Sequence, residues 1–244
     1  MKIYGKNPVL ERLKSNPRSI RRIFVQAGNP EHSYIALKAK KHGIPVIVSH
    51  ARHMMKLGKS LNTQGLVMDV EDFSYVDYDD LLDRVTAEAL TLVFLDGITD
   101  PQNLGGILRT TGSLGGFAIV IPTHDSVQVT DTVLRVACGG ENHVPVAKVN
   151  NISNAIQKAR DQGVLIAGSV VQDGESLYET ALSFPLGLVI GSEDKGIREV
   201  VQKRLDLRLT VPMAQPRMSL NAAHATTIFC YEIAKQKKTK TRQG

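Results

Sequence analysis

The sequence predicts an α/β protein with two domains, a small N-terminal α/β domain and a larger domain built on a parallel sheet. From residue 89 on, short apolar segments bounded by turn residues alternate with helical patterns, which is typical of parallel strands covered by helices on both faces. The first 70 residues form a separate basic unit, and an acidic segment lies between the two. A chain of 244 residues is long enough for two such domains.

The first domain, residues 1–70, is expected to alternate helices and strands. Helical patterns cover 8–14 and 32–43, with a further short helix before residue 65, and strand patterns cover 21–26, 44–49 and 65–70. Gly43 is expected to end the second helix, with Pro45 two residues later.

Residues 71–88 are acidic and less apolar than their neighbours, so we expect a linker that runs into a helix. The second domain, residues 89–244, has strand patterns at 90–96, 117–122, 144–149, 164–171, 185–191 and 206–213. The final ten residues, KQKKTKTRQG, are basic and polar and are expected to be disordered.

The net charge of +6 is unevenly distributed along the chain. Residues 1–70 hold 13 Lys and Arg against 3 Asp and Glu, residues 71–100 hold 1 against 9, and residues 101–244 hold 16 against 12. A basic excess confined to one segment favours a polyanion partner such as RNA, and a solvated basic surface without a partner is the alternative.

Membrane, secreted and zinc-binding classes are disfavoured. No apolar stretch approaches the roughly 18 residues of a membrane span, and MKIYGKNPVLERLK carries charges where a signal peptide is apolar. A cytoplasmic protein is therefore expected. Cys138 and Cys230 lie far apart without CxxC spacing, so we expect two reduced, buried thiols rather than a disulfide or a zinc site.

Three strand-to-helix loops carry the candidate functional residues, because ligands of open parallel sheets bind beyond the carboxyl ends of the strands. The first loop is DPQNLGG, residues 100–106. Asp100 is expected to cap a helix that has Pro101 at its first position and Asn103 in its first turn. The dinucleotide fingerprint G-x-G-x-x-G is absent, which excludes a nicotinamide-dependent enzyme.

Arg109 follows in the same helix and is expected to lie over the face that carries Gly105 and Gly106. Each glycine inside a helix costs about 1 kcal/mol relative to alanine, so these positions need a reason. Bare backbone could leave space for a bound group and for the guanidinium. Tight helix packing is the alternative explanation.

The second loop is GSEDKG, residues 191–196, which holds Glu193; a tight turn with an acidic residue before a helix would also explain it. The third loop lies within VPMAQPRMSLNAAHATTIFCYEI, residues 211–233. Here Ser219 is expected to cap a long amphipathic helix that has Asn221 in its first turn. Simple helix capping is the alternative role for Ser219.

In this order, the three loops resemble the three signature motifs of the SpoU/TrmH family of RNA ribose 2′-O-methyltransferases, in the SPOUT superfamily. YGKNPVLERL, residues 4–13, and the basic first domain resemble the substrate-binding domain of the RlmB-like two-domain subgroup. The resemblance covers essentially the whole chain. It implies a deep trefoil knot in the second domain, a pocket for bent S-adenosyl-L-methionine, and a homodimer whose active site lies near the subunit interface.

The resemblance also implies roles for individual residues. Five match family positions involved in activity or in shaping the site: Asn103, Arg109, Glu193, Ser219 and Asn221. The cofactor would be held by Ile190, Gly191, Gly196, Val211, Met213, Ser219 and Leu220. Because a guanidinium hardly loses its proton, we expect Arg109 to orient the ribose hydroxyl and stabilise negative charge rather than act as a base. No metal is expected, because methyl transfer from a sulfonium needs no Lewis acid.

The sequence departs from the family pattern at three places. Gln215 stands where the family usually has glycine, SLNAAH replaces S-L-N-V-S-V, and NTQG at 62–65 replaces N-H-Q-G, which puts Thr63 where an RNA-facing histidine is common. His224, within SLNAAH, is expected to lie on a helix face rather than to act in catalysis.

The motif residues that remain favour an active S-adenosylmethionine-dependent RNA ribose 2′-O-methyltransferase, acting on a guanosine of large-subunit ribosomal RNA. Two alternatives stay open. One is a transfer-RNA ribose 2′-O-methyltransferase, and the other is a non-catalytic knotted protein that binds RNA or assists ribosome assembly.

Overall fold

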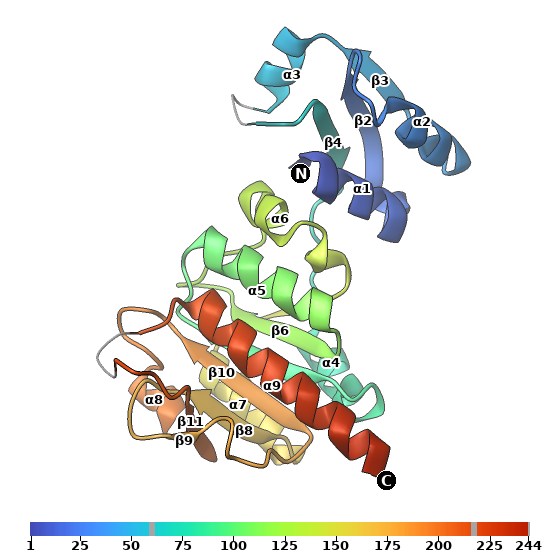
Figure 1. Cartoon of the computed structure of the whole chain (residues 1–244). Coiled ribbons are helices and arrows are strands. Elements are labelled where there is room, and N and C mark those ends of the chain that lie inside the picture. The colour runs from blue at the N-terminus through green and yellow to red at the C-terminus, as the bar shows by residue number, and fades with distance from the viewer. Residues whose placement is uncertain (59–61, 216–218, 244) are drawn as a thin grey trace.

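The computed structural model describes residues 1–58, 62–215 and 219–243, without the side chains of 241–243. Two sheets organise these residues, a four-stranded sheet near the N-terminus and a seven-stranded sheet in the rest of the chain (Figure 1). The predicted division into an N-terminal α/β domain and a C-terminal parallel-sheet domain agrees with this arrangement.

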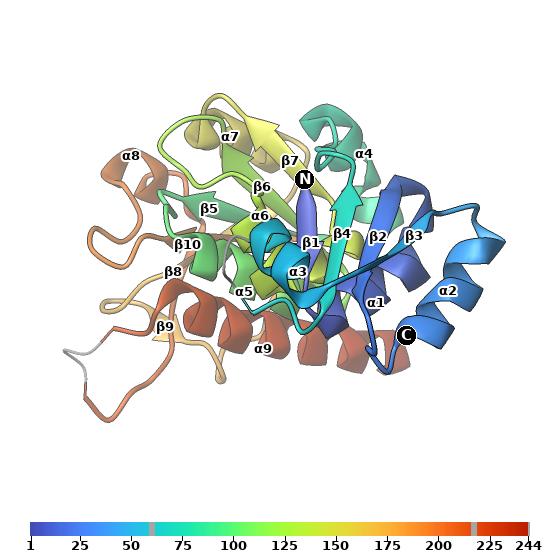
Figure 2. The ribbon, with the colours of Figure 1, turned by 90° about the horizontal axis from the view of Figure 1, so that it is seen from above.

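The first domain is a mixed sheet with the strand order β1-β4-β2-β3, and Figure 2 shows the four strands side by side. Its elements are β1 (Lys2–Tyr4), α1 (Lys6–Ser15), η1 (Pro17–Ser19), β2 (Ile20–Gln26), α2 (His32–Lys41), β3 (Val46–Ser49), α3 (Ala51–Leu57) and β4 (Leu66–Val70). Strand β4 runs antiparallel to β1 and β2, and β2 runs parallel to β3. The three expected strands are present, and Gly43 ends α2 with the positive φ of 66° that favours glycine. The short strand β1 was not predicted.

The second sheet has the strand order β7-β6-β5-β10-β8-β11-β9, and its described pairs are all parallel, as expected. Its strands are β5 (Thr91–Asp96), β6 (Phe117–Pro122), β7 (Val146–Val149), β8 (Leu165–Ser169), β9 (Glu175–Ser176), β10 (Leu186–Gly191) and β11 (Leu207–Thr210). Only the two-residue strand β9 lies outside the predicted segments.

Helices cover both faces of this sheet. One face packs against α4 (Tyr78–Ala87), α7 (Ile152–Asp161) and α8 (Glu199–Gln202), and the other against α5 (Pro101–Leu114), α6 (Asp131–Ala137) and α9 (Ala222–Gln243). A 3-10 turn, η2 (Gly140–Asn142), follows α6. Helix α4 buries Leu81, Leu82 and Val85 in the core of the second sheet, so the C-terminal part of the expected linker 71–88 belongs to that domain.

The expectation of a disordered C-terminal tail is wrong, because α9 continues to Gln243. Its last turns are anchored by lysines that donate to backbone carbonyls. Lys237 Nζ donates to Ala89 O at 2.7 Å, and Lys240 Nζ donates to Leu182 O at 2.8 Å. These long-range contacts hold a segment whose composition alone suggests disorder.

A continuous apolar core joins the two domains. Val9 and Leu13 of α1 belong to the same buried cluster as Val133 and Leu134 of α6. Figure 1 shows α6 between the first domain and α5. The described helices include none long and apolar enough to cross a lipid bilayer. The trefoil knot stays a prediction.

Candidate active site

The three predicted loops follow β5, β10 and β11, and they meet because the carboxyl ends of parallel strands share one edge of the sheet. Asp100 caps α5 as expected: its Oδ1 accepts a hydrogen bond from the Gln102 backbone N–H at 2.8 Å, and Pro101 occupies the first helical position. This start places Asn103 in the first turn of α5, where it is buried.

Asn103, Glu193 and Asn221 come from the three different loops and form one hydrogen-bonded cluster. Asn221 Nδ2 donates to Asn103 Oδ1 at 2.7 Å and to Glu193 Oε1 at 3.2 Å. Asn103 Nδ2 also donates to Glu193 Oε1, as does the backbone N–H of Ala222 at 3.3 Å. Within the described part of the chain, the hydrogen bonds to the Glu193 carboxylate all reach one oxygen, Oε1, which leaves Oε2 available to a ligand.

The cap of α9 is Asn221, not Ser219 as the sequence predicts. Asn221 Oδ1 accepts from the backbone N–H of Ala223 at 2.9 Å, so the same side chain caps the helix with its oxygen and joins the cluster with its nitrogen. Ser219 is exposed and lines the neighbouring cavity. Asparagine and serine are similarly good caps, so sequence alone does not choose between two candidates two residues apart.

Beside the cluster lies a cavity of about 300 Å³ at the ends of β8, β10 and β11. Its lining includes all seven residues expected to hold a cofactor: Ile190, Gly191, Gly196, Val211, Met213, Ser219 and Leu220. The loop between Gly191 and Gly196 closes tightly, because a Cβ at Gly191 would lie 2.2 Å from the carbonyl carbon of Gly196. Gln215 is exposed next to residues 216–218, which lie outside the described part of the chain.

Asp96 and Arg198 support the second loop, and sequence reasoning missed both. Asp96 ends β5 with its side chain fully buried, and its carboxylate accepts from the Arg198 backbone N–H at 2.8 Å and from Nε at 2.7 Å. This pair ties the segment after Gly196 to the neighbouring strand. A charged residue at the end of an otherwise apolar strand was the available signal.

Arg109 lies apart from the cluster. It is six residues after Asn103, which is about 9 Å along a helix axis. The side chain is exposed, and its Nη1 lies 3.7 Å from Cys138 Sγ at the end of α6. The structure of this single chain therefore brings together Asn103, Glu193 and Asn221 around the cavity edge, and leaves Arg109 on the surface of α5.

The glycines of α5 serve helix packing, so the interpretation that they leave space for a bound group is wrong. A Cβ at Gly105 would lie 2.5 Å from Val136 Cβ of α6, and one at Gly112 would lie 2.5 Å from Gly140 O. A Cβ at Gly106 would lie 3.0 Å from Ala223 Cβ of α9. Neighbouring backbone and side chains fill the space that the glycines leave.

Thr63, His224 and the two cysteines lie outside the Asn103, Glu193 and Asn221 cluster. Thr63 is buried, and its Oγ1 accepts from the Gly65 backbone N–H at 3.2 Å, so its side chain stabilises a turn and is shielded from solvent. His224 is exposed on α9, as expected for a helix-face residue. Cys230 is buried as expected, whereas Cys138 is half-buried. The described residues include no group of three or more His, Cys, Asp or Glu side chains that could hold a metal ion.

Two protein-family models match this chain. Residues 90–231 match the model of the SpoU rRNA methylase family, and residues 2–76 match that of the RNA 2′-O ribose methyltransferase substrate-binding domain. The chain belongs to the SpoU rRNA methylase family. It is thus a member of a family of RNA 2′-O ribose methyltransferases, with the N-terminal substrate-binding domain and the C-terminal SPOUT domain of that family.

Individual relatives extend over the whole chain. The 23S rRNA (guanosine-2′-O-)-methyltransferase RlmB of Pseudomonas putida is 31% identical over 245 residues, which cover 98% of each protein. An uncharacterized tRNA/rRNA methyltransferase of Synechocystis sp. is 34% identical over 240 residues, which cover 96% of this chain and 62% of that protein. The chain thus spans less than two thirds of the length of the cyanobacterial relative.

Solved structures show the same fold. The SpoU methyltransferase AviRb from Streptomyces viridochromogenes superposes with a TM-score of 0.79 at 22% identity, over 98% of this chain and 90% of that one. A second structure of AviRb, in complex with the cofactor AdoMet, gives a TM-score of 0.77 at 22% identity, over 98% and 91% of the two chains.

Proposed function

We propose that this protein is an S-adenosylmethionine-dependent RNA ribose 2′-O-methyltransferase that modifies a guanosine of large-subunit ribosomal RNA. The observation that carries the proposal is the Asn103, Glu193 and Asn221 cluster at the edge of a cavity formed by the second and third loops. The RlmB relatives, similar over nearly the full chain, support the choice of ribosomal RNA and of guanosine.

The cavity suits S-adenosylmethionine in its size and in the chemistry of its lining. Its volume of about 300 Å³ falls within the usual range of small-molecule sites. Apolar surface for an adenosine ring comes from Ile190, Leu220 and Phe229. The Glu193 carboxylate also lines the cavity, and its negative charge would favour a sulfonium nearby. The bound cofactor supplies an electrophilic methyl group on a positively charged sulfur.

The protein's own residues must place a ribose 2′-hydroxyl, a weak nucleophile, in line with that methyl group. Asn103 and Asn221 fix the orientation of the Glu193 carboxylate through Oε1 and leave its Oε2 for substrate or cofactor. Arg109 provides exposed guanidinium donors for a backbone phosphate and for the charge that develops on the ribose oxygen. A general-base role is disfavoured by the high pKa of any guanidinium.

Arg109 would act on a site completed by a second copy of the chain, because its own cluster lies about two helical turns away. An exposed apolar patch that includes residues of α9 supports a homodimer. Tyr178, Ile228 and Tyr231 are 65%, 39% and 63% exposed and line a groove of about 310 Å³ with Val211 and Pro212. Surface patches of this kind commonly mark protein interfaces. Light scattering in solution tests the dimer.

The function is tested by transfer of labelled methyl from S-adenosylmethionine to unmodified ribosomal and transfer RNAs, with the product mapped for 2′-O-methylation. Arg109→Ala is expected to lower the rate by roughly 10²–10³, because it removes a donor to the developing charge. Arg109→Lys is expected to recover little, since an ammonium cannot make the same forked contacts.

A mapped signal on transfer RNA alone would replace the ribosomal substrate. No transfer to any RNA by a folded protein that binds RNA would contradict the proposal, and near-normal turnover of Arg109→Lys would rule out a specific guanidinium role.

A further inference from the structure

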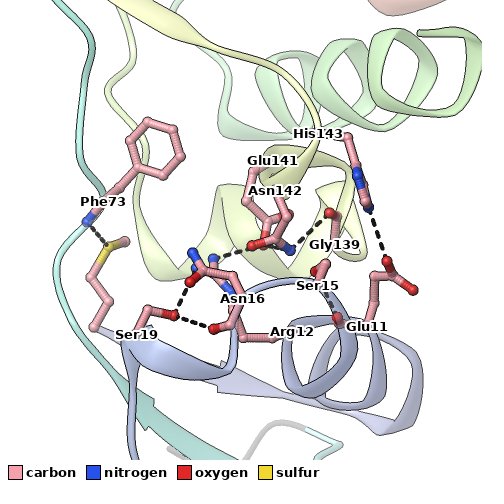
Figure 3. A network of polar contacts seen from close by, with 11 residues as sticks. Glu11, Arg12, Ser15, Asn16, Ser19, Phe73, Gly139, Glu141, Asn142 and His143 are labelled. Carbon is pink, nitrogen blue, oxygen red and sulfur yellow. Dashed lines mark hydrogen bonds and ion pairs between the residues drawn. The ribbon is translucent and has the colours of Figure 1, made fainter.

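A buried ion pair joins the two domains. Arg12 of α1 donates from Nη2 to Glu141 Oε1 of η2 at 2.9 Å, and the two side chains are 7% and 1% exposed (Figure 3). Arg12 Nη1 also donates to Ser19 Oγ at 3.3 Å. The ion pair therefore links a side chain of the RNA-binding domain to a turn of the methyltransferase domain 129 residues later.

Two further contacts surround this pair. His143 Nε2 lies 2.9 Å from Glu11 Oε1, and the Lys2 backbone N–H donates to Asp131 Oδ1 at 3.0 Å (Figure 3 shows the first). Gly139 lets α1 approach closely, since a Cβ there would lie 2.4 Å from Glu11 Cγ. The first domain thus touches both the start of α6 and the turn that follows it.

The opposite side of the same turn packs on α5 at Arg109. A Cβ at Gly140 would lie 2.6 Å from Leu108 O and 2.7 Å from Arg109 Cα. Cys138, two residues before Gly140, is the residue whose Sγ lies 3.7 Å from Arg109 Nη1. Residues 138–143 therefore form a thin layer between α1 and the turn of α5 that carries Arg109.

Burying this ion pair carries a desolvation cost. Arg12 Nε and Glu141 Oε2 are both buried without a hydrogen-bond partner in the part of the chain that the structure describes. Burial raises the pKa of the Glu141 carboxyl, and Arg12 opposes this effect. Apolar residues could fill such a site at equal or lower cost, and buried ionic groups are best known for specifying one arrangement over others.

We propose that Arg12 and Glu141 are positioning residues, which hold the RNA-binding domain in one register against the turn of α5 that carries Arg109. RNA held by the first domain is thereby presented to this arginine. The inference rests on the proposed methyltransferase function. The ion pair thereby connects the substrate-binding domain to the part of α5 that carries Arg109.

Glu141→Gln in the full chain tests this proposal, because it removes the charge and keeps the size of the side chain. We expect kcat for methylation of the RNA substrate to fall about 10-fold, because a modest misplacement of reacting groups has effects of this order or larger. The KM for RNA and the affinity for S-adenosylmethionine should stay within about twofold. Glu88→Gln, in the exposed Arg84–Glu88 pair, is the matched control and should leave kcat unchanged.

The double variant Arg12→Met/Glu141→Met removes both charges and leaves no buried group of the pair without its partner, so it keeps the question answerable if Glu141→Gln does not fold. The same fall in kcat at constant KM supports the proposal. Wild-type kcat in either folded variant overturns it, as does a loss confined to KM or to cofactor affinity. A wild-type protein without methyl transfer would instead refute the proposed function.

Discussion

At the scale of single residues, Asn221 has two roles in one side chain. Its oxygen caps α9, and its nitrogen donates to Asn103 and Glu193. Helix capping and site geometry are therefore coupled, and a substitution separates them only if it keeps one of the two contacts and removes the other.

Asn221→Ala is expected to lower the free energy of unfolding by about 1 kcal/mol, because it removes the cap, and to lower methyl transfer as well. Asn221→Ser retains a capping oxygen, so its stability should lie close to that of the wild type. The rate of methyl transfer should still fall roughly 10-fold, because serine lacks the amide nitrogen that donates to Glu193. Denaturant unfolding and methyl transfer would be measured on both variants. Equal activity of Asn221→Ser and wild type would contradict a role for the donor.

The two cysteines should differ in reactivity. Burial raises the pKa of Cys230 to about 12, so its thiol keeps its proton far above pH 9, the range in which an ordinary thiol titrates. Because the folded state holds this proton and the unfolded state loses it, the contribution of Cys230 to stability is present below pH 9 and is lost as the pH rises towards 12.

Labelling with a thiol reagent at about pH 8, just below the ordinary thiol range, followed by mass spectrometry, is expected to modify half-buried Cys138 and leave Cys230 unmodified until the protein is unfolded. Cys138→Ser serves as the control that assigns the fast site. Rapid labelling of Cys230 in the folded protein would show that the core around α9 opens readily.

At the scale of elements, α5 acts as a packing centre. It approaches α6 at Gly105, η2 at Gly112 and α9 at Gly106, and Thr110 Oγ1 lies 2.9 Å from Thr227 Oγ1 of α9. The close approach of three segments explains why this helix contains glycines that lower its intrinsic helix propensity.

Gly112→Ala is expected to destabilise the protein by about 1–3 kcal/mol, since the new methyl group would meet the backbone of Gly140 and force a shift. Ser113→Ala, at the next and exposed position of the same helix, should change stability by no more than about 0.5 kcal/mol. Thermal or denaturant unfolding of the two variants would check this difference. A stabilised Gly112→Ala would mean that helix propensity outweighs the packing at this position.

At the scale of the whole molecule, the large excess of basic residues lies in the N-terminal domain. The matched substrate-binding domain, residues 2–76, includes the segment with the large basic excess. Since this domain shares a core with α6, its deletion would expose apolar surface, and surface substitutions test its role more cleanly.

Replacing four exposed cations by glutamine, Lys40, Lys41, Arg52 and Lys56, is expected to weaken RNA binding and flatten its salt dependence. The slope of log K against log salt should fall by about 0.7–0.9 for each RNA phosphate that these side chains no longer neutralise. Lys203→Gln, at the residue that follows α8 and far from this domain in the sequence, is the control. An unchanged slope in the fourfold variant would exclude these cations from the RNA interface.

Features that depend on local pattern follow from the amino-acid sequence alone. Strand and helix periodicity predicts the parallel sheet with two covered faces, and Asp100 with Pro101 predicts the start of α5, because these signals act over a few residues. The order of the three motifs predicts which loops meet, since parallel strands place their carboxyl ends together.

The long-range partners of each residue are known only from the folded structure. It showed that Gly105 and Gly112 accommodate neighbouring segments, that Asn221 rather than Ser219 caps α9, and that Arg12 pairs with Glu141 across 129 residues. Such contacts follow from how elements pack in three dimensions. The spacing of residues along one element carries no information about which partner will face it across the core. For this reason the position of the first domain against α6 and η2 was not predictable from the sequence.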